Sequence, residues 1–143
     1  MFNSPQRAIL ALLQDDTRNK ILTILNDSPC HPDVLVEHIG VSRTAIEKHL
    51  KQLLAYGIIE RRTQTVPRLR YIYSLTIPAQ NLIEAISVAS ETFIDFTKEN
   101  LDDQLLKTEQ AFLFNIIPKE EYEQIKENID EKLLNFDIEE SEG

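Results

Sequence analysis

Residues 40–57 read GVSRTAIEKHLKQLLAYG. The segment opens with a tight Gly-Val-Ser turn, and Ser42 suits the N-cap of a helix that continues to about Tyr56. Gly57 favours the left-handed backbone that ends helices. The apolar residues after Ser42 recur at three- and four-residue spacing and form one stripe: Ile46, Leu50, Leu53 and Leu54. The pattern predicts a helix with one buried side and one polar side.

The polar side of this predicted helix carries residues that suit duplex DNA. The major groove is about 12 Å wide and admits one α-helix, and the start of such a helix usually meets base edges. We therefore expect Arg43 to bond guanine and Thr44 to touch a thymine methyl group. Lys48 and Lys51 suit phosphates. Glu47 would either accept a bond from cytosine or pair with Arg43 or Lys51. The candidate contacts of this helix are Ser42, Arg43, Thr44, Glu47, Lys48 and Lys51.

Three shorter helices are expected before this one. Ser4-Pro5 predicts the start of the first, and the second begins near Asp15. Pro32 opens the third, and Gly40 follows its end. Two helices joined by the turn at residues 40–42 form a helix-turn-helix.

A β-hairpin is expected after the helix-turn-helix. Residues 58–60 and 69–75 are rich in strand-forming residues, and the segment between them, residues 61–68, reads RRTQTVPR. This segment is read as the long basic tip of the hairpin, and arginines on such a tip must point at solvent or at an anion. A wing lying on the DNA backbone or minor groove would use them. The candidate wing contacts are Arg61, Arg62, Arg68 and Arg70.

The chain beyond Pro78 is predicted to be helical, with helices at 79–97, 102–115 and 119–135 and an acidic, frayed tail from Asp137. The broad apolar face of 79–97 either folds back on the first part or meets a second copy. We favour a second copy, because a small winged domain offers little surface to cover it. The prediction is a mainly α fold with a small β-hairpin: a winged helix-turn-helix domain over 1–78 and a helical dimerisation region with an acidic tail over 79–143.

Charge is divided unevenly along the chain. The net charge of −9 is the sum of +3 over residues 1–78 and −12 over residues 79–143. A local basic patch is what matters for phosphate binding, so overall acidity does not argue against double-stranded DNA as a partner. Cys30, the single cysteine, cannot form an intramolecular disulfide, which fits a reducing compartment. No signal segment and no apolar run of about 20 residues occurs. We expect a soluble cytoplasmic protein with no membrane partner.

Catalysis has no support in the sequence. The chain has only three glycines, and no HExxH, GxSxG or CxxC spacing occurs. We expect that the protein is not an enzyme.

Four stretches together resemble the ArsR-type winged helix-turn-helix regulators of archaea and bacteria: DDTRNKIL at 15–22, VSRTAIEKHL at 41–50, LLAYGIIERR at 53–62 and RYIYSL at 70–75. The resemblance covers about residues 8–76. It departs from the family at Glu47, where a small hydroxyl residue is common, and at Pro67, where the wing often carries glycine. The resemblance implies a homodimeric transcriptional regulator, a repressor, on an inverted-repeat operator. Dimerisation would use flanking helices, with candidates Ile9, Leu12, Leu82, Ile86, Ala89, Phe93 and Phe96.

Two other functions are open at this point. Winged helices also serve as protein-interaction modules in transcription assemblies, since fold does not dictate function, and the overall acidity fits that role. A metal- or thiol-responsive regulator would use Cys30 with His31. Metal-sensing ArsR proteins carry paired cysteines on the helix before the recognition helix, or sets of His, Asp and Glu on the last helix. Residues 34–37, at the first of these places, read VLVE and contain no cysteine. We therefore expect no metal and no cofactor.

Overall fold

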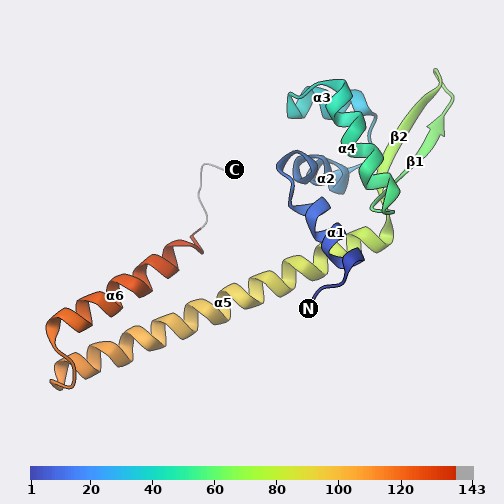
Figure 1. The fold of residues 1–143 in the computed structure, drawn as a ribbon. Helices are drawn as coiled ribbons and strands as arrows, with labels where there is room; N and C mark the ends of the chain where they lie inside the picture. The colour runs from blue at the N-terminus through green and yellow to red at the C-terminus, as the bar shows by residue number, and fades with distance from the viewer. Residues whose placement is uncertain (138–143) are drawn as a thin grey trace. The chain divides into compact units, whose positions relative to one another are not determined.

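The computed structural model describes residues 1–137, which form two compact units, residues 1–84 and 85–137 (Figure 1). The predicted acidic tail falls almost wholly on 138–143, outside the described residues. No helix within residues 1–137 is long and apolar enough to cross a membrane. The elements are α1 (Ser4–Gln14), α2 (Asp16–Asp27), α3 (Pro32–Ile39), α4 (Arg43–Ala55), β1 (Ile59–Gln64), β2 (Arg70–Leu75), α5 (Ile77–Leu113) and α6 (Lys119–Leu134).

The ends of the first four helices follow from local capping chemistry. The side chain of Ser42 accepts a hydrogen bond from the backbone of Ala45, which starts α4 as predicted. Gly40 has a φ of 79°, which confirms the left-handed stop after α3. The predicted cap of α1 was wrong by one residue. Asn3 caps this helix instead of Ser4: its Oδ1 accepts a hydrogen bond from the backbone N–H of Gln6, and the Oε1 of Gln6 accepts one from the backbone N–H of Asn3.

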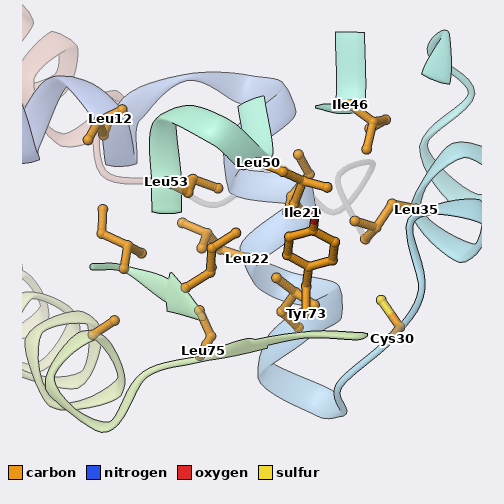
Figure 2. Packing of buried hydrophobic residues seen from close by; sticks show 14 residues of the cluster. Leu12, Ile21, Leu22, Cys30, Leu35, Ile46, Leu50, Leu53, Tyr73 and Leu75 are labelled. Atoms are coloured by element: carbon orange, nitrogen blue, oxygen red, sulfur yellow. The ribbon is translucent and has the colours of Figure 1, made fainter. Parts of the chain in front are cut away.

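The core of the first unit joins α1, α2, α3, α4, the hairpin and the start of α5. Figure 2 shows the labelled side chains of these elements pointing into one common space. Ile46, Leu50 and Leu53 are at most 1% exposed, which confirms them as core, whereas Leu54, the fourth residue of the predicted stripe, is half-buried against that core. Burial of this stripe fixes which side of α4 remains on the surface.

The hairpin is longer than predicted. β1 and β2 pair antiparallel from Ile59 with Leu75 to Gln64 with Arg70. The expectation of a long basic tip was therefore wrong, because the ladder continues through Arg61 and Arg62 and leaves only residues 65–69 as the loop. A backbone bridge between Cys30 and Tyr73 also ties the hairpin to the segment before α3.

Helix α5 corrects the predicted division of the C-terminal part. It runs without a break over 37 residues, so the predicted separate helices at 79–97 and 102–115 are one helix. Pro78 lies in its first turn, where a missing N–H costs little. The apolar stripe ending at Phe96 does not mark a helix end. A second stripe that includes Leu101 begins on another side of the helix.

Within the second unit, α6 returns antiparallel along the later part of α5 (Figure 1). Leu101 and Ile129 are buried, and the rings of Phe112 and Tyr122 stack with centroids 4.6 Å apart. Asn115 in the connecting turn has a φ of 58°, which Asn tolerates well. The two helices therefore form an α-hairpin with its own small core.

Arg18 connects three helices of the first unit. Its Nε donates to the carbonyl oxygen of Leu12 (2.8 Å), and its Nη1 donates to Gln52 Oε1 (2.9 Å) and lies 3.2 Å from His49 Nδ1. Because a guanidinium only donates, His49 Nδ1 must accept this hydrogen bond. His49 and Gln52 belong to α4, so Arg18 fixes that helix against the end of α1 and the start of α2.

Asp15 adds a charge-dependent contribution at the same place. Its carboxylate accepts a hydrogen bond from the backbone N–H of Arg18 (2.9 Å) and caps α2. This hydrogen bond and the nearby charge of Arg18 hold the pKa of Asp15 below its ordinary value of 3.8. The ionised form is therefore favoured in the folded state. Its stabilisation is present above the ordinary pKa and is lost as the pH falls through the folded pKa.

We expect Asp15→Asn to lower the melting temperature at neutral pH and to have no effect in strong acid. Asparagine keeps the capping oxygen but not the charge, so only the pH-dependent part of the stability is removed. Thermal unfolding followed by circular dichroism from neutral to strongly acidic pH measures the difference between the two proteins. A difference that stays constant with pH would show that the carboxylate charge is not its source.

Candidate nucleic-acid interface

The side of α4 opposite the core carries all six predicted contacts. Ser42 is the N-cap, and the other five lie on the helix with their side chains exposed: Arg43, Thr44, Glu47, Lys48 and Lys51. Lys48 and Lys51 form no ion pair within residues 1–137. Two unpaired ammonium groups thus project from a helix whose other side is anchored in the core.

Arg43 is held by two carboxylates of the chain itself. Its Nε donates to Glu47 Oε1 at 3.2 Å, one turn along α4. Its Nη1 donates to Asp33 Oδ1, near the start of α3. The second oxygen of Asp33 lies 3.2 Å from His31 Nδ1. Of the two sequence-based pairings of Glu47, the one with Arg43 is present in this structure.

The wing arginines lie on both faces of the hairpin. Alternation along β1 places Arg61 on the same face as the buried Ile59, and its guanidinium lies over the ring of Tyr71, 4.4 Å from the centroid. Arg62 points to the opposite face, as does Arg70, whose Nε donates to Gln64 Oε1 at 2.7 Å. Arg68 is exposed in the loop. The structure thus does not bring the four arginines together on one surface.

Two further residues of this region were missed by sequence reasoning. Asp33 contacts Arg43 across the turn between α3 and α4, and the sequence gives no periodic signal for a contact over that separation. Tyr71 contacts Arg61 because the hairpin register makes them diagonal neighbours. The sequence pattern does not fix where each strand begins and ends, so it could not predict which residues of the two strands are paired.

The predicted dimerisation residues differ in exposure. Phe93 and Phe96 are 64% and 68% exposed, and Ala89 is also exposed. Ile9, Leu82 and Ile86 are half-buried, whereas Leu12 is buried in the chain's own core and presents no free surface. The stripe Leu82, Ile86, Ala89, Phe93 and Phe96 has alternating spacings of four and three residues, the period of a coiled-coil seam.

Cys30 is buried beside the hairpin, and burial raises the pKa of its thiol. His31 caps α3 by accepting a hydrogen bond from the backbone of Asp33 at 3.1 Å. Over residues 1–137, no group of three or more His, Cys, Asp or Glu side chains is placed to hold a metal ion.

Two helices joined by a tight turn, followed by a two-stranded wing, define a winged helix-turn-helix protein. Residues 15–61 match the sequence profile described as "Bacterial regulatory protein, arsR family". This part of the chain is similar in sequence to the helix-turn-helix of that family. It is 38% identical over 47 residues to the HTH-type transcriptional regulator CmtR of Mycobacterium tuberculosis and of Mycobacterium bovis, a match that spans 33% of this chain and 40% of those relatives.

Solved structures share the fold. The diamide-treated YodB from B. subtilis aligns with a TM-score of 0.58 at 24% identity, over 66% of this chain and 94% of that one. The homodimeric winged helix-turn-helix DNA-binding domain Mb0332 from Mycobacterium bovis, a possible ArsR-family transcriptional regulator, aligns with a TM-score of 0.55 at 17% identity, over 64% of this chain and 83% of that one. The predicted fold class is thereby confirmed.

Proposed function

We propose that the protein is a homodimeric transcriptional regulator, acting as a repressor, that binds an inverted-repeat operator in double-stranded DNA. The observation that carries the proposal is the two-sided character of α4. Its apolar side is sealed in the core, and its exposed side presents Lys48 and Lys51 with no carboxylate partner within residues 1–137. The ArsR-type match of residues 15–61 supports the same function.

The proposed roles divide along the exposed side of α4. Ser42, Arg43 and Thr44 stand at the helix start, where base edges are usually met. Lys48 and Lys51 would neutralise phosphates and so set affinity more than sequence choice. A hairpin inserted in a narrow groove has a phosphate strand on either side, so wing arginines on both faces are compatible with minor-groove contact.

Dimerisation is proposed through α5. The exposed Phe93 and Phe96 end a stripe with coiled-coil spacing, and α6 packs against a different stripe of the same helix. The same stripe on a second copy of the protein has the matching spacing of apolar residues and is the proposed partner. The relative Mb0332 is described as homodimeric, which fits this arrangement. Two α4 helices would then read half-sites about 34 Å apart, one turn of DNA.

We expect Lys48→Ala with Lys51→Ala to weaken binding to all duplexes alike. Each phosphate contact contributes about 0.9 to the slope of the logarithm of affinity against the logarithm of salt concentration. The double variant should therefore lower the magnitude of the slope by about 1.8, twice that contribution. Fluorescence anisotropy with labelled duplexes over a salt series measures it.

The matched control is Lys107→Ala with Lys119→Ala, which removes the same charge from exposed positions of α5 and α6. This control should leave the slope unchanged. A wild-type protein whose binding to duplex does not vary with salt would contradict the proposed function. An equal slope change in the two double variants would contradict the assignment to α4.

A further inference from the structure

We propose that Asp33 and Glu47 form an acidic clasp on Arg43 that keeps its guanidinium from phosphates and reserves it for a guanine base. The inference rests on the proposed function and assigns specificity to two carboxylates. In it, Asp33 is a positioning residue, because it would act on DNA through Arg43. The clasp is defined here as Asp33, Arg43 and Glu47.

The geometry of the clasp leaves part of Arg43 free. Nε is engaged by Glu47 and Nη1 by Asp33, whereas Nη2 has no partner within residues 1–137. A guanidinium has five N–H donors in one plane, so hydrogens of Nη2 and Nη1 remain for further acceptors. Guanine presents two neighbouring acceptors, N7 and O6, in the major groove. A base can therefore be bound without breaking the contacts to the carboxylates.

The net charge of the clasp disfavours a phosphate but not a guanine base. One guanidinium and two carboxylates sum to one negative charge at the start of α4. A phosphate approaching Arg43 would stand beside two like charges, and such an arrangement is penalised. A phosphate oxygen could reach the same free N–H groups, but it would lie beside the carboxylates of Asp33 and Glu47, and its negative charge makes that contact unfavourable. Guanine carries no net charge and avoids this repulsion.

The position of Asp33 makes the clasp a contact between the two helices of the motif. Asp33 belongs to α3 and Arg43 to α4, and His31, the cap of α3, lies 3.2 Å from the free oxygen of Asp33. Arg43 loses side-chain freedom before DNA arrives, so less ordering remains to be done when a base is bound.

The test is Asp33→Asn, measured with a random-sequence duplex and with the duplex recovered by selection from a random pool. If Asp33 withholds Arg43 from phosphates, the variant gains one phosphate contact. The salt slope with the random duplex should then steepen by about 0.9. Binding to the random duplex should tighten, and the affinity ratio of selected to random duplex should fall. Circular dichroism checks that the variant is folded.

Two controls separate this effect from a general loss of negative charge. Glu37→Gln removes the same charge from an exposed position of α3 and should leave the slope unchanged. In an Arg43→Ala background, Asp33→Asn should no longer steepen the slope. The clasp is refuted if wild type binds duplex but Asp33→Asn leaves the slope and the ratio unchanged, or if Glu37→Gln gives the same gain. Wild type that binds no duplex would instead refute the proposed function.

Discussion

Replacing Phe93 and Phe96 with glutamate should convert the protein to a monomer and lower its affinity for a two-half-site duplex by at least about a hundredfold. Both rings are largely exposed in the single chain and lie on the coiled-coil stripe of α5. Glutamates there would place like charges across the proposed seam. The second half-site would then no longer be bound intramolecularly. Solution mass and duplex affinity measure the two effects.

The control for this variant is Val88→Glu with Leu106→Glu. Both residues are exposed apolar positions of α5. They are eighteen residues apart, which is five full turns, so they lie on the same side of the helix, and this side is away from the stripe. This control should keep the doubled mass. The stripe would be excluded as the dimer contact if the phenylalanine variant also kept the doubled mass, or if both variants became monomeric.

Leu50→Ala should lower the free energy of unfolding by about 2–5 kcal/mol. Leu50 is 1% exposed and lies in the core shared by α2, α4 and the hairpin (Figure 2). Truncation removes its transfer free energy and leaves a cavity that the surrounding helices can fill only in part. Because α4 depends on this anchor, DNA affinity should fall at temperatures where the variant begins to unfold. Urea unfolding followed by circular dichroism measures the change.

The adjacent variant Lys51→Ala is the matched control for stability. Lys51 is exposed, and alanine is a strong helix former, so the free energy of unfolding should change by no more than about 0.5 kcal/mol. A loss for Leu50→Ala as small as that of the control would contradict the assignment of Leu50 to the anchoring core.

Local signals in the sequence were enough to predict the helix-turn-helix. Ser42, Gly40 and Pro32 act on their own backbone or on residues within one turn, so their effects can be read without the tertiary structure. The stripe of α4 was predictable for the same reason, because its period belongs to a single helix. The exposed positions of α4 then followed from the position of the core.

The remaining features depend on contacts that the sequence pattern does not contain. The change of apolar stripe near Phe96 resembled a helix end, but α5 continues and presents Leu101 on the side where the second unit has its core. The faces of the wing arginines depended on a register that could be assigned only after the strand ends were known. The contact of Asp33 with Arg43 depends on how α3 and α4 cross, which no local rule fixes.

The burial of Cys30 has a chemical consequence for the protein. Only the thiolate attacks peroxides, disulfides and alkylating reagents. Burial of Cys30 raises the pKa of its thiol, which disfavours the thiolate, and it also blocks the approach of these reagents. The sulfur therefore packs as a small hydrophobic group beside Tyr73, and we expect it to react more slowly with such reagents than an exposed cysteine does.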